Sequence, residues 1–337
     1  NIRVFNIDIE VTSTEGFPKP EDAAYPITAI CIHDSIADKF VTFGFKEGDN
    51  WSSENSVLEP DLLDKVVYIN CRDEKELVTK FLQYWTTFPP HVITGWNIDG
   101  FDMPYIYNRL NYLGFDTRKL SPWRKVSIRQ ARTQRGPEDR VVMRGVSCID
   151  YMEVYKKQKV QDSYRLDNIA TIELGEKKLD YSEVSGLHNL YFENFQKFID
   201  YNIQDVNLVK RIDEKMGLID AQIMIAFTSL LNLDEVHGTV RIWDALISNE
   251  LHKENKIIPF HLSNVGAGGS IPGGHVKEPH LGKHGWCCSF DLNSLYPHLI
   301  MQYNISPETL NENYRFLPND SIEQRIHKLL NGIEITN

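Results

Sequence analysis

The chain has 337 residues, of which 42% are hydrophobic and 25% are charged, and its formal net charge is -11 at pH 7. These values are ordinary for a soluble globular protein and leave room for one large domain or for two to three smaller ones. No apolar run is long enough to span a bilayer, which excludes a membrane-spanning protein. The five cysteines form no Cys-x-x-Cys pair, which favours a reducing cytoplasm over secretion.

The acidic balance argues against indiscriminate binding to polyanions, but one segment is strongly basic. Between residues 123 and 144 the only acidic residues are Glu138 and Asp139, whereas the basic residues are Arg124, Lys125, Arg129, Arg132, Arg135, Arg140 and Arg144. A basic strip on an acidic protein is a candidate contact for phosphate groups. The alternative is an ordinary solvated hairpin, which an isolated run of charges also produces.

The first part of the chain alternates between strand and helix signals. Residues 5–11 alternate apolar and polar side chains, as a half-buried strand does, and residues 27–32 are its expected neighbour. Residues 45–60 are polar and predict a loop, and a short strand follows at 66–69. Asp73 and Glu76 resemble a helix cap, and apolar side chains then recur at helical spacing until Pro89 and Pro90. A strand at 91–96 and a helix at 104–113 come next.

The basic segment predicts a β-hairpin with arms at 125–132 and 140–149, joined by residues 134–139. A long helix is expected over residues 188–216 with Gly217 as its C-terminal cap, and residues 218–260 stay mostly helical. The glycine-rich stretch 265–274 predicts a joint, and residues 285–292 predict a strand that opens a second unit. The expected organisation is an α/β domain over 1–216, a helical connector over 217–265 and a further unit over 266–337.

Four acidic residues in three separated clusters carry the strongest functional signal. Asp8 and Glu10 stand two residues apart on a predicted strand, so their side chains share one face. Asp102 follows the turn-like segment 96–101. Asp205 stands four residues after Tyr201, which places these two side chains on one helical face. Hard divalent cations such as Mg²⁺ prefer carboxylate collections of this kind.

Two such ions close together support in-line attack of water on a phosphodiester. In this hypothesis two Mg²⁺ ions, for which Mn²⁺ substitutes, are bound by Asp8, Glu10, Asp102 and Asp205. Tyr201 orients the attacking water, because its ordinary acidity is too weak for an obvious general base. Each cluster by itself has a plain structural explanation, as a sheet edge, a capped turn or a helical pair. Their occurrence together, in order and at domain-scale spacing, favours one shared site.

The clusters resemble the three exonuclease motifs of the family B DNA polymerases, in the same order. The matching residues are Asp8-Ile9-Glu10, Asn97-x-x-x-Phe101-Asp102 and Tyr201-x-x-x-Asp205. Downstream, the segment Asp291-Leu292-Asn293-Ser294-Leu295-Tyr296-Pro297 resembles the first polymerase motif of that family. Residues 241–245, 276–279 and 304–309 are most similar to the polymerases of T-even-type bacteriophages. The likeness covers essentially the whole chain.

The resemblance implies a 3′→5′ proofreading exonuclease with a ribonuclease-H-like fold, a mixed sheet flanked by helices, over residues 1–216. It implies that residues 266–337 begin a polymerase palm, in which Asp291 binds the polymerase metals. The incoming dNTP would be bound by Ser294, Leu295 and Tyr296, and Tyr296 would also exclude a ribose 2′-OH.

The resemblance further implies that the basic hairpin lies near the primer–template junction and helps to part the strands. The expected DNA contacts are Asn97, Phe101, Arg129, Arg132, Arg135 and Arg140. An aromatic side chain, Phe101 or Trp96, would stack on unpaired bases without sequence preference. For Trp96 a place in the core is the more natural expectation.

The sequence also departs from the family pattern. Ile271-Pro272-Gly273-Gly274 stands where many relatives have Tyr-x-Gly-Gly, and His298 replaces a small hydroxyl residue. The fingers motif and the second palm motif are absent from this sequence, so we expect an incomplete polymerase site.

The most consistent interpretation is a piece of a replicative, phage-type DNA polymerase that acts in the host cell cytoplasm. Its partners would be DNA and, in the full polymerase, dNTP, a sliding clamp and other replisome proteins. The alternative is one half of a split polymerase that serves mainly as a noncatalytic DNA-binding scaffold. A stand-alone repair or RNA-processing exonuclease is disfavoured, because such an enzyme has no use for residues 291–297.

Overall fold

The computed structural model describes residues 2–13, 16–133, 136–176, 187–257 and 276–306, together with Thr309, Ser321 and Gln324; for residues 132–133, 136–138 and 187–188 it describes the backbone alone. The chain divides into two compact units, Asn1–His261 and Leu262–Asn337. The first unit contains the sheets and all of the helices up to residue 253. Each unit is described by itself below.

Six strands of the first unit form one mixed sheet in the spatial order β4-β3-β2-β1-β5-β8. Their bounds are β1 Val4–Val11, β2 Ile27–Asp34, β3 Lys39–Gly44, β4 Val66–Asn70, β5 Val92–Gly95 and β8 Ser147–Asp150. The β1–β2 and β2–β3 pairs are antiparallel, whereas the β3–β4, β1–β5 and β5–β8 pairs are parallel. The predicted α/β class is confirmed, and the strands expected near residues 5, 27, 66 and 91 are present.

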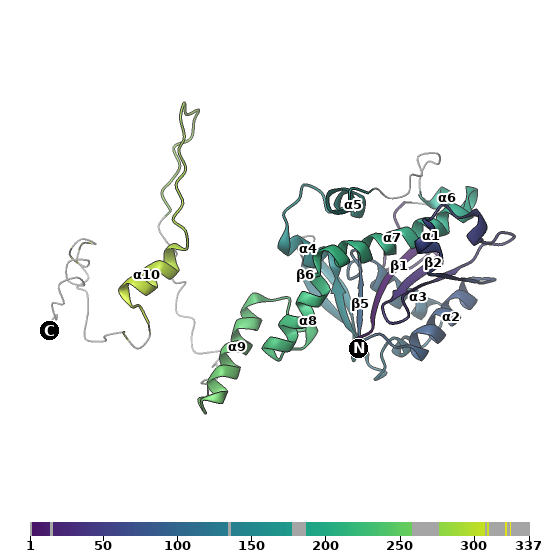
Figure 1. Ribbon diagram of the computed structural model, residues 1–337, viewed down its shortest axis with the longest axis horizontal. Helices are drawn as coiled ribbons and strands as arrows, with labels where there is room; N and C mark the ends of the chain where they lie inside the picture. The colour runs from purple at the N-terminus through teal and green to yellow at the C-terminus, as the bar shows by residue number, and fades with distance from the viewer. Residues whose placement is uncertain are drawn as a thin grey trace. The chain divides into compact units, whose positions relative to one another are not determined.

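Helices cover both faces of this sheet (Figure 1). Those of the first unit are α1 Pro60–Leu63, α2 Glu74–Thr87, α3 Asp102–Tyr112, α4 Tyr151–Gln158, α5 Leu166–Leu174, α6 Leu187–Glu193, α7 Phe195–Met216, α8 Leu218–Ser229 and α9 Thr239–Lys253, with the 3₁₀ turns η1 Ser53–Asn55, η2 Thr117–Leu120 and η3 Leu233–Glu235. No helix among the described residues is long and apolar enough to cross a membrane.

The alternation of side chains along β1 determines which residues face which helix. Phe5, Ile7 and Ile9 are buried in one apolar cluster with side chains of α2 and α3. On the opposite face α7 runs across β1 and β2 (Figure 1), and its apolar side chains pack on Ala29 and Cys31 of β2. The polar side chains of β1 therefore face α7, because successive side chains of a strand point to opposite faces.

The start of α2 follows the predicted cap. The Asp73 side chain accepts a hydrogen bond from the Glu76 backbone N–H at 2.8 Å, and the Glu76 carboxylate accepts one from the Arg72 backbone N–H at 2.9 Å. The first bond satisfies a donor that a helix start leaves without a partner, and the second ties the residue before the cap to the first turn. Leu77, Phe81 and Trp85 then face the sheet core, as their spacing predicts.

The predicted hairpin is correct in place but wrong in its second arm. Its strands are β6 Val126–Thr133 and β7 Gly136–Met143, which are antiparallel. Residues 147–150 do not continue the hairpin; as β8 they pair with β5 in the main sheet. The chain changes sheets at Gly145, whose φ of +87° and close approach to Pro122 exclude most side chains. A strand pattern that runs on through both segments does not reveal such a turn.

The single helix expected over residues 188–216 is also wrong, because two helices, α6 and α7, occupy this stretch. Asn194 separates them with non-helical backbone angles, φ -147° and ψ 80°, and its side chain accepts a hydrogen bond from the Lys197 backbone N–H at 3.0 Å. Asparagine favours this N-cap position over a helix interior. The apolar period continues across the break, which hides it from a pattern search. Gly217, in the left-handed region, ends α7 as predicted.

The second unit contains one described helix, α10 Leu295–Tyr303. The strand expected over residues 285–292 is wrong: residues 276–292 are irregular and exposed, and within the described part of this unit no strand pairs with them. A strand needs such a partner for its backbone groups. The glycine-rich stretch 265–274 lies outside the described residues.

A buried ion pair ties α2, α3 and the start of β2 together. The Arg109 guanidinium donates to both carboxylate oxygens of Glu74, at 2.7 and 2.6 Å, and to the carbonyl oxygens of Ala23 and Ala24. The same Glu74 carboxylate accepts a hydrogen bond from the Ile27 backbone N–H at 2.8 Å. Both side chains are almost fully buried, so loss of one partner leaves the other charge unpaired in the core.

We therefore expect Arg109→Met to lower the free energy of unfolding by ~3–5 kcal/mol, because it leaves the Glu74 carboxylate buried without its countercharge. The matched control is Arg72→Met, which breaks the exposed Arg72–Glu76 pair at the start of α2, the helix that carries Glu74. Urea denaturation of the 337-residue chain measures both variants. Equal stability losses in the two variants would contradict the assignment of the Arg109 pair to the core.

Candidate metal centre

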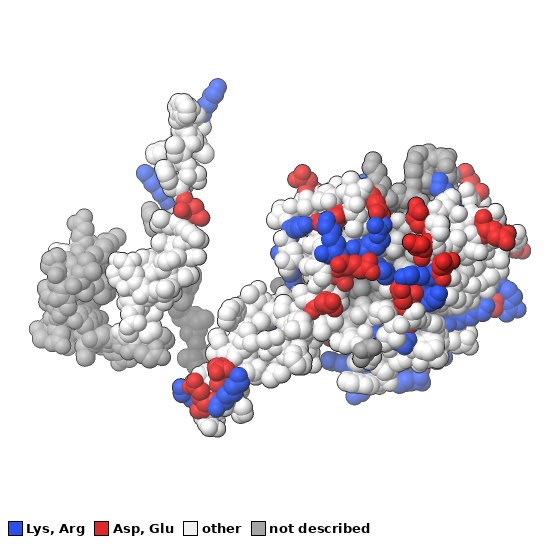
Figure 2. Space-filling view, in the orientation of Figure 1, with Lys and Arg blue, Asp and Glu red and all other residues white. Residues whose placement is uncertain are grey.

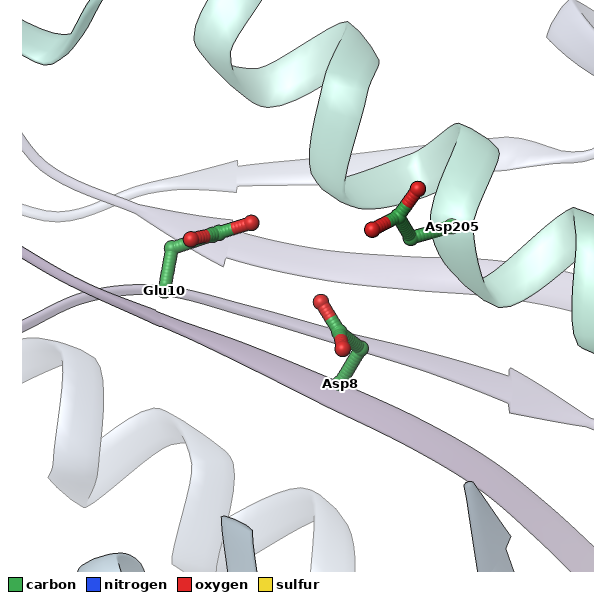
Figure 3. Close-up of side chains that lie close together, drawn as sticks. All are labelled: Asp8, Glu10 and Asp205. Atoms are coloured by element: carbon green, nitrogen blue, oxygen red, sulfur yellow. The ribbon is translucent and has the colours of Figure 1, made fainter. Parts of the chain in front are cut away.

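Three carboxylates from distant parts of the sequence meet at one point. Asp8, Glu10 and Asp205 each offer a carboxylate oxygen, and these three atoms lie within 4.8 Å of one another. Figure 3 shows Asp8 and Glu10 rising from β1 and Asp205 reaching toward them from α7. Glu10 and Asp205 are 8% and 6% exposed, so most of this charge is withheld from bulk water.

Two buried asparagines dock α7 on β1. The Asn6 side-chain amide donates to the Val206 carbonyl oxygen at 2.7 Å, and the Asn202 side-chain amide donates to the Asp8 carboxylate at 2.7 Å. Val206 directly follows Asp205, so these contacts hold Asp205 beside the strand. Sequence reasoning missed both asparagines. The available signal was position: Asn6 shares the polar face of β1 with Asp8, two residues away.

The sheet is irregular beside Glu10. The register between β1 and β2 shifts between Glu10 and Val11, and the Thr28 hydroxyl donates to the Glu10 carbonyl oxygen at 3.1 Å. Register shifts of this kind locally bend a strand and redirect its side chains. The irregularity coincides with the end of the strand where the carboxylates gather.

Asp102 lies next to this group but has a different environment. It is the first residue of α3 and is 3% exposed, and its carboxylate accepts a hydrogen bond from the backbone N–H of Ile9, the residue between Asp8 and Glu10. Burial, with a smaller contribution from the Asp8 charge, raises the pKa of Asp102 well above its ordinary value. A cation bound nearby would favour the ionised form of this carboxyl group and lower its pKa again.

The donor set fits a hard divalent cation. The clustered atoms are carboxylate oxygens, with no thiol or imidazole among them, and Mg²⁺, Mn²⁺ and Ca²⁺ prefer such ligands. The structure brings together the carboxylates of Asp8, Glu10 and Asp205. The Asp102 carboxylate lies beside them, bonded to the Ile9 backbone between Asp8 and Glu10. The assignment of all four as ligands stays a prediction.

Tyr201 lies on α7 one turn before Asp205, as the sequence indicates. Its side chain is 4% exposed and belongs to the apolar cluster between α7 and β2. Its expected role in orienting water stays a prediction.

The turn before Asp102 has a tightly determined backbone. Asn97 has a φ of +64°, and its carbonyl oxygen accepts hydrogen bonds from the backbone N–H groups of Gly100 and Phe101 at 3.1 and 3.0 Å. A Cβ at Gly100 would lie 2.7 Å from the Asn97 side-chain oxygen, so any other residue there would force the Asn97 side chain to move. This turn sets the direction in which α3 begins, and with it the place of Asp102.

The neighbouring strands hold the same turn through Asp99. The Asp99 backbone N–H donates to the Asp150 carboxylate at 3.2 Å, and its own carboxylate accepts a hydrogen bond from the Cys148 thiol at 3.0 Å. The Arg140 guanidinium from β7 forms an ion pair with Asp99 at 3.2 Å. Sequence reasoning expected Arg140 at DNA phosphates, whereas the structure places it on this carboxylate.

The two aromatic side chains considered for base stacking, Phe101 and Trp96, have different surroundings. Phe101 is half-buried and packs against Tyr105 and against Phe17, whose side chain is 80% exposed. Sequence reasoning missed Phe17, although a large aromatic side chain in a polar loop was a usable signal. Trp96 is partly buried and packs against a core cluster, in line with its expected structural place, and donates its indole N–H to the Tyr164 carbonyl oxygen at 3.0 Å.

The structure describes only part of the basic strip of residues 123–144. Arg129 is exposed on β6 opposite Arg140, whereas the Arg132 side chain and all of Arg135 lie outside the described residues. On the face that Figure 2 shows, acidic and basic side chains are mixed around α7, where ion pairs join Arg211 to Glu176 and Lys210 to Glu214. The strip as a phosphate contact therefore stays a prediction.

The expected palm residues all lie in the second unit. Asp291, Ser294, Leu295 and Tyr296 are exposed, and Ser294 precedes α10 with a φ of +51°. Among the described residues, the carboxylate group around Asp8 is the only acidic cluster with metal-binding spacing, and Asp291 is not in it. Roles for these four residues in metal and dNTP binding stay predictions.

Two family matches cover most of the chain. Residues 1–169 match the family described as "DNA polymerase family B, exonuclease domain", and residues 237–329 match "DNA polymerase family B". The chain belongs to the family B DNA polymerases. The predicted membership is thus confirmed. Asp8, Glu10 and Asp102 lie in the exonuclease match, Asp291 lies in the polymerase match, and Asp205 lies between the two.

Curated relatives support the same family B membership. The DNA-directed DNA polymerase of Escherichia phage RB69 is 37% identical over 98% of this chain, and that of Enterobacteria phage T4 is 34% identical over 94%. The DNA polymerase delta catalytic subunit of Dictyostelium discoideum is 25% identical over 91%. The matches cover 38%, 37% and 28% of these relatives, so the chain spans less than two fifths of their length.

Asp150 is a further buried carboxyl group, beside the turn that leads to Asp102. It caps α4 by accepting a hydrogen bond from the Glu153 backbone N–H at 3.3 Å. Burial, together with the nearby Asp99 charge, raises the pKa of Asp150 to about 7. Because the pKa of Asp150 is higher in the folded than in the unfolded chain, the folded state binds this proton more tightly. The resulting contribution to the free energy of unfolding is fully present below the unfolded pKa and is lost as the pH rises to about 7.

We therefore expect Asp150→Asn to gain stability relative to the unmodified chain as the pH rises from 5 to 8, by on the order of 2–3 kcal/mol. The asparagine retains an acceptor for the helix cap but cannot ionise. The measurement is urea denaturation of both proteins at the two pH values without added metal. A stability difference that does not change with pH would contradict the raised pKa of Asp150.

Proposed function

We propose that this chain carries the 3′→5′ proofreading exonuclease of a replicative, phage-type DNA polymerase, with Mg²⁺ as its cofactor. The observation that carries the proposal is the meeting of the Asp8, Glu10 and Asp205 carboxylates within 4.8 Å in a family B chain. The substrate is the 3′ end of single-stranded DNA, from which mispaired terminal nucleotides are removed. In the phage-infected host this reaction takes place in the cytoplasm.

The residues of the centre have distinct tasks. Asp8, Glu10 and Asp205, with Asp102 beside them, bind two Mg²⁺ ions, for which Mn²⁺ substitutes. When bound, such a pair of ions supplies an acidified water for attack on the phosphodiester and offsets the charge of the leaving oxygen. Tyr201 positions that water by a hydrogen bond. The chain thus provides ligands and orientation, and the buried setting strengthens both electrostatic effects.

The surroundings of the centre suit unpaired DNA. Phe17 and Phe101 present adjoining aromatic rings at the turn that leads to Asp102, with ring centroids 5.3 Å apart. Stacking on aromatic side chains holds bases without regard to sequence, which a proofreading enzyme requires. The hairpin β6–β7 helps to part the primer from the template. Asp291, Ser294, Leu295 and Tyr296 begin the dNTP site, and the full polymerase works with a sliding clamp and other replisome proteins.

The double variant Asp8→Ala/Glu10→Ala is expected to lower the rate of single-strand hydrolysis at least ~1,000-fold, which corresponds to about 4 kcal/mol of transition-state stabilisation. The measurement is degradation of a 5′-labelled single strand in the presence and absence of Mg²⁺. The matched control is Glu59→Ala/Asp61→Ala, which removes two exposed acidic residues at the same spacing and leaves the rate unchanged.

Two outcomes would count against the proposal. Hydrolysis that persists in Asp8→Ala/Glu10→Ala would show that another site cuts the DNA. An unmodified chain that binds single strands without cutting them would instead favour the noncatalytic scaffold. We expect no primer extension by the same sample, because among the described residues Asp291 belongs to no acidic cluster with metal-binding spacing.

A further inference from the structure

The Asn202 side chain is placed to control one carboxylate of the metal centre. Asn202 lies on α7 and is completely buried, with an exposed fraction of 0%. Its side-chain amide lies 2.7 Å from the Asp8 carboxylate oxygen Oδ2 and 3.4 Å from the Asp8 carbonyl oxygen. One amide group therefore faces both the carboxylate and the backbone of the same residue.

A neutral donor suits this position because of the charge around it. Three carboxylates within 4.8 Å repel one another, and Asp8, which is half-buried, has lost part of the hydration that would stabilise its charge. A lysine or arginine in place of Asn202 would offset that repulsion but would also cancel the negative charge that attracts a cation. An amide N–H stabilises the carboxylate and leaves its net charge intact. A carboxylate accepts several bonds, so this contact is compatible with a metal ligand.

We propose that Asn202 is a positioning residue for Asp8, which fixes the orientation of this carboxylate and thereby raises the affinity of the centre for a divalent cation. The inference rests on the proposed function of the centre. It adds a residue that acts on the metal only through a ligand.

Asn6 provides a matched control for this inference. It joins the same two elements, β1 and α7, with a hydrogen bond of the same 2.7 Å length, and it is 5% exposed. Its acceptor, however, is the Val206 carbonyl oxygen and not a carboxylate. Loss of Asn6 therefore weakens the docking of α7 without removing the donor to Asp8.

The test is the affinity for Mn²⁺, measured by calorimetric titration without DNA on the 337-residue chain and on Asn202→Leu and Asn6→Leu. Leucine keeps the branched shape of asparagine and removes the donor. We expect Mn²⁺ to bind Asn202→Leu at least ~10-fold more weakly than the unmodified chain, equivalent to about 1.4 kcal/mol. Asn6→Leu also loosens α7 beside Asp205, so we expect it to lose some affinity but clearly less than Asn202→Leu, because its donor to Asp8 remains. Circular dichroism verifies that each variant is folded. Asn202→Ala replaces Asn202→Leu in the titration if the leucine variant does not fold.

Three results would distinguish a failure of the proposed function from a failure of the role proposed for Asn202. Failure of the unmodified chain to bind Mn²⁺ would overturn the proposed function itself. Unchanged Mn²⁺ affinity in the folded Asn202 variant, beside a binding unmodified chain, would overturn only the role of Asn202. Equal weakening in the Asn202 and Asn6 variants would also overturn it, because docking of α7 would then explain the effect.

Discussion

The contact between α7 and the polar face of β1 is the interaction on which the metal centre depends. β1 alone supplies two carboxylates on one face, and α7 supplies the third. Apolar packing holds α7 on the sheet, but apolar contacts do not specify a register by themselves. The amides of Asn6 and Asn202, both directed across the junction, specify it, because a shifted helix would leave buried polar groups without partners.

Local patterns predicted the parts of the centre that are local. The alternation around Asp8 and Glu10 is a property of one strand, and the four-residue spacing of Tyr201 and Asp205 is a property of one helix. Both were readable because side-chain direction follows directly from the backbone repeat. The docking asparagines were not readable, because their partners lie about two hundred positions away in the sequence. The local pattern placed Asn6 on the same face of β1 as Asp8, but it could not identify the partner of either asparagine.

The errors in the fold have a common physical origin. At Gly145 the chain moves from the hairpin to the main sheet, and at Asn194 one helix ends and another begins, yet the apolar pattern continues across both points. In each case one residue with special backbone angles decides the outcome. At residues 285–292 the pattern suits a strand, but within the described residues no neighbouring strand pairs with it. A strand is a property of a pair, so the pattern alone was insufficient.

The sequence distance between β1 and α7 has a consequence for biosynthesis. Asp8 leaves the ribosome long before Asn202, because Asn202 lies 194 positions later in the chain. Until α7 has emerged and docked, a nascent chain holds two carboxylates without their third partner. The centre can therefore be completed only after every strand of the main sheet has been synthesised, and a polypeptide that ends before α7 lacks the full ligand set.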